Sequence, residues 1–302
     1  MSRVQIVLAC LACLASLTAP AAAQDPQAKT VVTVVASFSI LADLVRNVGG
    51  ERIAVSALVG PDGDAHVYEP TPADSKRIAA ATLVVVNGLG YEGWIDRLVA
   101  ASGSKAPVVV ASAGVTPRAG EGGHGHAAED PHAWQSAANA KRYVANIRDA
   151  LIRIDPPGRD LYAANAAAYL ARLDALDAEI RQSLATIPAE RRRVITGHDA
   201  FGYFGDAYGI AFLSPQGVST EAEPSARDLA RLITQIRAEK ISAVFLENVI
   251  DPRLVRQIAR ETGVRIGGTL VSDALTGPGG LAPTYVALMR HNAHTLRAAL
   301  SD

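Results

Sequence analysis

The sequence predicts an α/β protein of two lobes, each with a parallel sheet flanked by helices, joined by one long rigid helix. Three observations predict this fold class. Short apolar runs alternate along the chain with longer runs of helical periodicity. The short runs are apolar at consecutive positions, which is typical of parallel strands covered on both faces. A long stretch in the middle of the chain is free of helix-breaking residues.

The first lobe is expected to cover residues 24–156. Valine-, leucine- and alanine-rich runs predict its strands, and apolar residues at steps of three or four predict the helices between them. The expected strands are 31–36, 53–59, 83–87 and 108–111, and the expected helices are 40–48 and 72–80.

The linking helix is expected at 157–188, because no proline or glycine occurs between Gly158 and Pro188. Its apolar residues recur at steps of three or four: Tyr162, Ala166, Tyr169, Leu173, Leu176, Ile180, Leu184 and Ile187. At 1.5 Å per residue such a helix would exceed roughly 40 Å, enough to span both lobes. The apolar stripe is short for the alternative, a coiled-coil dimer, so we interpret the helix as a strut within a monomer.

The second lobe is expected at 189–302, with the same alternation of apolar and helical runs. Its expected strands are 193–196, 210–213, 241–246 and 264–271, and its expected helices are 200–208, 225–239, 252–262 and 283–300. Each lobe therefore receives about four strands.

Residues 1–23 are interpreted as a cleavable signal peptide. Arg3 precedes an apolar run from 4 to 17, and small residues stand before a cleavage point at Gln24. This apolar run is shorter than a typical membrane-spanning helix. A lipid anchor at Cys10 is the less favoured alternative, because this cysteine comes so early in the leader. Both cysteines, Cys10 and Cys13, lie in the leader, so we expect a periplasmic protein without thiols.

The net charge and the length of the chain limit the functions that it can have. The chain has 29 basic and 30 acidic residues, and Arg3 is the only charge in the leader, so 28 against 30 gives the processed chain a net charge of −2. Nucleic-acid binding, which needs a basic surface, is therefore not expected. The remaining length exceeds that of one ordinary core and suits two modest lobes.

Three segments each place one of the 7 histidines of the chain beside acidic or rigid neighbours. They are 64–70 (DAHVYEP), 130–134 (DPHAW) and 196–201 (TGHDAF), with His66, His132 and His198, and the segment 270–274 adds Asp273. These residues follow expected strands or precede an expected helix that begins near Trp134. Ligands gather at the carboxyl ends of parallel strands, so one site between the lobes is expected, with two ligands from each. Asp273 alone could equally cap the helix after it.

The same segments resemble the metal-binding substrate-binding proteins of ABC importers for zinc and manganese, the cluster A-I group. The similarity extends over 64–72, 130–134, 197–204, 272–273 and the C-terminal 285–292, so it covers essentially the whole processed chain. It implies two α/β lobes, a rigid linking helix and one metal ion, with His66, His132, His198 and Asp273 at the ligand positions. It also implies delivery of the metal to an ABC permease and its ATPase, with a periplasmic metallochaperone as a further candidate partner.

The residue at 198 bears on the metal. Manganese-selective relatives usually have glutamate there, whereas three imidazoles and one carboxylate suit Zn²⁺ in a tetrahedral site. Mn²⁺ prefers more oxygen ligands and is the alternative cargo, above all if Asp273 binds through both oxygens. The loop at 121–130, with His124 and His126, resembles a shortened form of the histidine-rich loop of zinc-specific members. It is interpreted either as an accessory capture site or as a solvated linker. His291 and His294 are expected to be exposed on the terminal helix.

Two other functions compete with transport. The order of histidines and aspartates is similar to that of metal-dependent phosphohydrolases of the HD type, but those are all-helical, and four protein ligands leave no position for an activated water. A surface adhesin is the other alternative. We therefore expect a binding protein and not an enzyme. The metal affinity of this binding protein should fall below about pH 6.5, as its histidines become protonated.

Overall fold

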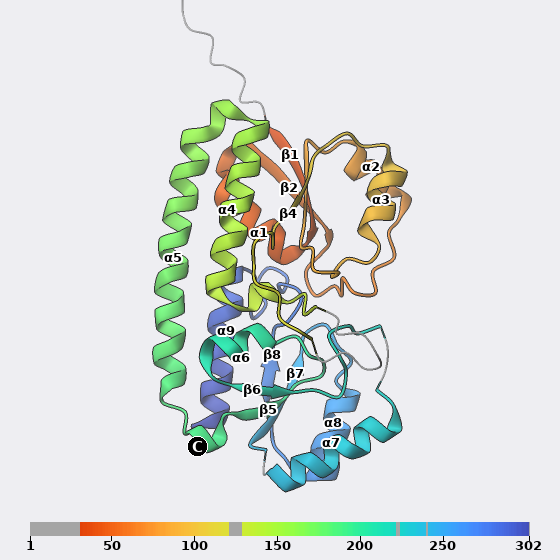
Figure 1. The fold of residues 1–302 in the computed structure, drawn as a ribbon, viewed down its shortest axis with the longest axis vertical. Coiled ribbons are helices and arrows are strands. Elements are labelled where there is room, and N and C mark those ends of the chain that lie inside the picture. The colour runs from red at the N-terminus through yellow and green to blue at the C-terminus, as the bar shows by residue number, and fades with distance from the viewer. Residues whose placement is uncertain (1–30, 121–128, 222–223, 240, 302) are drawn as a thin grey trace, which may run out of the picture. The chain divides into compact units, whose positions relative to one another are not determined.

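The computed structural model describes residues 31–120, 129–221, 224–239 and 241–301, which belong to one compact unit. Two four-stranded parallel sheets, β1–β4 and β5–β8, define an N-terminal and a C-terminal lobe (Figure 1). The expected fold class is confirmed. The signal peptide, with Cys10 and Cys13, and the histidines of the 121–128 loop, His124 and His126, lie outside the described residues.

The N-terminal sheet has the strand order β2-β1-β3-β4, and every pair in it is parallel. Buried valines and leucines of β1 and β3 occupy its centre, as expected for strands covered on both faces. The elements of this lobe are β1 (Val32–Phe38), α1 (Ser39–Gly49), β2 (Ile53–Val59), α2 (Pro72–Ala79), β3 (Leu83–Val86), α3 (Ile95–Ser102), β4 (Val108–Val110) and α4 (Ala137–Ile154).

The C-terminal sheet has the order β6-β5-β7-β8, which repeats that of the first sheet. Its elements are β5 (Arg193–Ile195), α6 (Gly202–Tyr208), β6 (Ala211–Leu213), α7 (Ala226–Glu239), β7 (Ala243–Glu247), α8 (Arg253–Thr262), β8 (Ile266–Leu270) and α9 (Tyr285–Leu300). A small separate core lies between α7, α8 and this sheet, whereas the main core extends through both lobes.

The long helix α5 (Arg159–Ala185) is preceded by a 3-10 turn, Pro156–Gly158. Its predicted apolar residues from Tyr162 to Leu184 are all buried. The helix packs against α1 and α4 of the first lobe and against α9 and α6 of the second (Figure 1). At 27 residues it extends for about 40 Å, which lets one buried stripe contact both lobes.

Two of the details that differ from the sequence-based expectations are the burial of His291 and the segment near Trp134. His291 is half-buried rather than exposed, with its Nε2 2.8 Å from the carbonyl oxygen of Thr269, whereas His294 is exposed as expected. The helix expected near Trp134 is a 3-10 turn, Ala133–Gln135, followed by α4. None of the helices in the described part of the chain is long and apolar enough to cross a membrane.

Candidate metal centre

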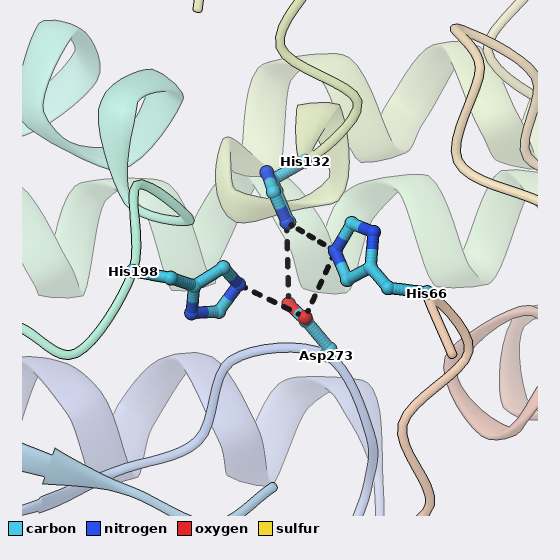
Figure 2. Close-up of side chains that lie close together, drawn as sticks. All are labelled: His66, His132, His198 and Asp273. Carbon is cyan, nitrogen blue, oxygen red and sulfur yellow. Dashed lines mark hydrogen bonds and ion pairs between the residues drawn. The ribbon is translucent and has the colours of Figure 1, made fainter. Parts of the chain in front are cut away.

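The structure brings His66, His132, His198 and Asp273, named below the four-residue cluster, to one place (Figure 2). His66 lies in the loop after β2, and His132 directly precedes the 3-10 turn before α4. His198 and Asp273 each lie three residues beyond the ends of β5 and β8. Because parallel strands end at a common edge of a sheet, each lobe presents two of these side chains to the other.

The donor atoms of the cluster converge. One ligand atom from each residue lies within 4.8 Å of the others. The Nε2 atoms of His66 and His132 are 3.2 Å apart, and the Nε2 of His66 is 3.4 Å from Asp273 Oδ2. Asp273 Oδ2 is 3.1 Å from His198 Nε2, and Asp273 Oδ1 is 3.5 Å from His132 Nε2. The edge of a tetrahedral zinc site with bonds of 2.0–2.1 Å is about 3.3 Å, so these separations suit a single ion.

The cluster is closed to solvent. The side chains of His132, His198 and Asp273 have no exposed surface, and that of His66 is 5 % exposed. Asp273 Oδ1 accepts no hydrogen bond although it is buried. A buried carboxylate oxygen without a hydrogen bond is costly unless a cation faces it. The donor set therefore fits a metal ion on chemical grounds.

Two carboxylates outside the cluster face the second ring nitrogens of its histidines. Asp130 Oδ1 lies 2.8 Å from His132 Nδ1, and Glu247 Oε2 lies 2.8 Å from His198 Nδ1. Glu247 Oε1 also accepts hydrogen bonds from the backbone N–H groups of Gly197 and His198, at 2.6 and 3.0 Å. The Asp130 carboxylate fixes the orientation of the His132 ring, the Glu247 carboxylate lies against the His198 ring, and both Nε2 atoms face Asp273.

The two Asp-x-His segments share one local geometry. The Oδ1 atoms of Asp64 and Asp130 accept hydrogen bonds from the backbone N–H of His66 and His132, both at 2.9 Å. Each aspartate thus closes an Asx turn that places the histidine two residues later. The spacing was visible in the sequence, but the orienting role of Asp130 had not been predicted.

Tyr91 and Trp134 form part of the wall of the site, and neither was predicted from the sequence. The Tyr91 ring packs edge-on against His66 with centroids 4.7 Å apart, and its hydroxyl donates to the Asp273 carbonyl oxygen at 3.4 Å. Trp134 Nε1 donates to the Ser272 carbonyl oxygen at 3.0 Å. Aromatic residues from one lobe therefore support the backbone that carries the carboxylate of the other.

The site concentrates negative charge on Asp273. Burial alone raises the pKa of this carboxyl, but His198 and His132 outweigh burial and hold the pKa well below its usual range. Burial lowers the pKa of His132, yet Asp273 and Asp130 raise it to about 9. The pKa of His198 is likewise raised, because Glu247 and Asp273 outweigh its burial, whereas burial lowers the pKa of His66. The raised pKa values of these two imidazoles favour positive charge beside the carboxylate, which is the role a metal cation would take.

Comparison with known proteins gives a family match over nearly all of the described chain. Residues 34–299 match the ZnuA family, described as "Zinc-uptake complex component A periplasmic".

Relatives of known name resemble the chain over most or all of its length. The manganese-binding lipoprotein MntA of Halalkalibacterium halodurans is 34% identical over 301 residues, covering 100% of this chain and 98% of that protein. The iron-binding protein YfeA of Yersinia pestis is 35% identical over 263 residues, covering 87% and 84%. The structure of the periplasmic zinc binding protein TroA from Treponema pallidum matches with a TM-score of 0.84 and 33% identity, covering 90% of this chain and 99% of that one. These relatives differ in the metal that their names state.

Proposed function

Because this chain belongs to the ZnuA family of periplasmic zinc-uptake components, we propose that its cargo is Zn²⁺, held by the four-residue cluster. The family supplies the metal-binding component of ABC importers and not enzymes, so the phosphohydrolase alternative is excluded. Such components pass their metal to a permease driven by an ATPase. The observation that carries the proposal is the convergence of three imidazoles and one buried carboxylate within 4.8 Å.

Zinc is favoured by the chemistry of these donors. Three nitrogen ligands and one carboxylate form a set that suits a four-coordinate zinc ion with no open position. The carboxylates of Asp130 and Glu247 support this reading, because they present both histidines through Nε2.

Manganese is the second candidate, and one observation favours it. Both oxygens of Asp273 face imidazoles, Oδ1 toward His132 and Oδ2 toward His198. An aspartate in this position can bind through both oxygens and raise the coordination number toward that preferred by Mn²⁺. Relatives such as MntA of Halalkalibacterium halodurans are named for manganese.

Calorimetric titration of zinc and manganese into metal-free protein tests both candidates. We expect one ion per chain, tighter binding of zinc than of manganese, and loss of tight binding in His198→Ala. His294→Ala, on the exposed face of α9, serves as the matched control and is expected to bind like the natural chain. Unchanged affinity in His198→Ala would remove that residue from the site, and preferential binding of manganese would reverse the assignment of the cargo.

We also propose the maturation and division of the chain expected from the sequence: leader 1–23, N-terminal lobe 24–156, linking helix 157–188 and C-terminal lobe 189–302. Several relatives are named lipoproteins, so the lipid anchor at Cys10 is the competing outcome to cleavage before Gln24. Mass spectrometry of the processed chain distinguishes the two. An N-terminal Gln24 supports cleavage, and a lipid-modified N-terminal cysteine contradicts it.

A further inference from the structure

The loop that leads from β2 to His66 touches the C-terminal lobe at Asp62. The backbone N–H of Asp62 donates to the carbonyl oxygen of Leu275 at 2.8 Å. Its Oδ1 accepts from Asn248 Nδ2 and its Oδ2 from the backbone N–H of Gly277, both at 3.3 Å. One exposed residue of the first lobe thus makes three polar contacts with two loops of the second.

The backbone of Asp62 is in the left-handed region, with φ at 56°. Among the described residues other than glycine, only Leu89 shares a positive φ. This conformation is strained for an ordinary residue, whereas glycine adopts it freely. Aspartate tolerates it better than most residues. Position 62 therefore carries a carboxylate although glycine would adopt the backbone conformation with less strain. Both oxygens of that carboxylate accept hydrogen bonds from the other lobe.

Asn248 connects Asp62 to the backbone on both sides of Asp273. Its Nδ2 also donates to the carbonyl oxygen of Ala274 at 3.0 Å, and its Oδ1 accepts from the backbone N–H of Ser272 at 3.2 Å. Movement of Asn248 would thus move the segment that carries the carboxylate of the cluster.

A parallel contact lies two residues after Asp62. Thr220 of the second lobe donates through Oγ1 to Asp64 Oδ2 at 2.6 Å, while Asp64 Oδ1 holds the N–H of His66. The loop that positions His66 is therefore tied to the other lobe at two neighbouring points.

The hydrogen bonds of Asp62 differ from the buried hydrogen bonds that join the lobes next to the site. Trp134 and Gln135 donate to the carbonyl oxygen of Ser272 in a fully buried setting. The hydrogen bonds of Asp62 are exposed. When an exposed hydrogen bond opens, water can take the place of either partner, so these contacts can open without disturbing the core.

We propose that Asp62 and Asn248 form an interlobe latch that positions the segments of His66 and Asp273 and slows the release of bound metal. The effect of the latch on metal release rests on the proposed function. The contacts of the latch between the lobes do not require the ion. Its two residues are positioning residues, because neither belongs to the four-residue cluster.

The test is the rate of zinc release into an excess of chromogenic chelator, measured by stopped flow together with the rate of zinc binding. Asp62→Ala is expected to release zinc about tenfold faster, as for the loss of about 1.4 kcal/mol of interaction, with the binding rate changed far less. Asp62→Asn keeps an acceptor for Asn248 and tolerates the left-handed backbone, so it should restore most of the slow release. Asp96→Ala, at an exposed position on α3 of the same lobe, is the matched control.

Two further variants separate the carboxylate from the backbone. Asp62→Gly relieves the strained φ but removes both oxygens, and it should release zinc as fast as Asp62→Ala. Slow release from Asp62→Gly would overturn the latch. The double variant Asp62→Ala/Asn248→Ala should release zinc little faster than the faster single variant, because both act on one contact. Fully multiplicative effects would contradict a shared latch.

Amide hydrogen exchange on the metal-free protein tests the latch without metal. In Asp62→Ala, exchange of the Gly277 N–H should accelerate relative to the natural chain and to Asp96→Ala. Equal exchange in all three would overturn the latch. Failure of the natural chain to bind zinc or manganese would instead overturn the proposed function, so the two failures are distinguishable.

Discussion

Glu247 lies beside Nδ1 of His198, and Asp130 lies beside Nδ1 of His132. In both histidines Nδ1 is the ring nitrogen that faces away from Asp273. A neutral imidazole held in this way has one tautomer, with its lone pair on Nε2. The neighbouring carboxylates therefore decide which nitrogen is free for an ion.

The first prediction concerns Glu247→Gln, which keeps the shape of the side chain but removes its charge. We expect zinc affinity to fall by about 10–100-fold, because the variant no longer fixes and polarises the His198 ring. Competition with a chelator of known affinity measures the change. Glu179→Gln, an exposed carboxylate paired with Arg290, is the control and should bind like the natural chain. Equal affinity in both variants would show that Glu247 has no such role.

The second prediction concerns pH. The pKa of His132 is raised to about 9 and the pKa of His198 is also raised, so both residues favour the protonated form in the metal-free protein more than a free histidine does. Zinc must displace these protons, so its affinity should rise as pH increases toward about 9 and fall continuously below it. From the sequence alone, the loss of zinc affinity is expected below about pH 6.5, because that expectation uses the ordinary pKa of histidine.

Calorimetry at pH 7 in two buffers of different ionisation enthalpy measures the released protons. The apparent enthalpy of zinc binding should differ between the buffers in proportion to the protons released. The same enthalpy in both buffers would contradict the raised pKa values.

The start of α2 anchors the loop that carries His66. Thr71 and Asp74 form a capping box, and Tyr68, two residues after His66, donates its hydroxyl to Asp74 Oδ2 at 2.8 Å. Arg77 also pairs with Asp74. Burial raises the pKa of Asp74, but hydrogen bonds from Thr71, Arg77 and Tyr68 outweigh it and lower the pKa to about 2.

The third prediction is that Asp74→Asn destabilises the protein at neutral pH by about 2 kcal/mol. A depressed carboxyl pKa contributes stability that is fully present above the unfolded pKa and is lost as pH falls toward the folded pKa. The difference between Asp74→Asn and the natural chain should therefore be largest at pH 7 and shrink below about pH 4. Urea unfolding at several pH values measures it, with Asp96→Asn as an exposed control. A difference independent of pH would contradict the prediction.

The elements themselves were largely predictable, because continuous apolar runs and three-to-four-residue spacing are local properties of the chain. The strand expected at 53–59 is β2 with the same bounds, and the expected stripe of α5 is the buried one. The helix α4 was not assigned bounds, although Val144, Ile147 and Leu151 give it a regular buried face. The strand expected at 264–271 is longer than β8, because apolar residues continue beyond the hydrogen-bonded strand.

The four main residues of the site were predictable, and the sequence also offers Asp199 and Glu247 as carboxylates that could orient an imidazole, without indicating which imidazole. Short motifs indicate His66, His132 and His198, because each motif lies at the end of a strand or the start of a helix. The pairing of Glu247 with His198 spans 49 residues and depends on two strands, β5 and β7, that lie side by side in the sheet. Tyr91 contacts Asp273 across 182 residues. Contacts at such separations follow from the tertiary structure and leave no local pattern in the sequence.

In the molecule as a whole, the two lobes share the main hydrophobic core and both pack against α5, so buried apolar side chains join the lobes in addition to the site. A metal ion that binds only the folded protein nevertheless shifts the folding equilibrium by mass action.

The fourth prediction is that zinc raises the melting temperature of the metal-free protein. At a free concentration of one hundred times the dissociation constant the added stability is about 2.7 kcal/mol. Differential scanning calorimetry with zinc and with chelator measures the shift. His66→Ala should show a smaller shift, and His294→Ala should show the full one. A melting temperature that zinc leaves unchanged would contradict specific binding to the folded state.

The division of the cluster between lobes has a consequence for how the ion leaves. Two donors on each lobe make the protein a bivalent chelator whose halves are kept at a high effective concentration by the connecting chain. Neither pair of donors needs to bind strongly, because most of the affinity comes from engaging both pairs at once. A partner that separates the lobes would reduce a tetradentate site to two weak bidentate ones. The ion could then depart in a single opening step without successive exchange of four ligands.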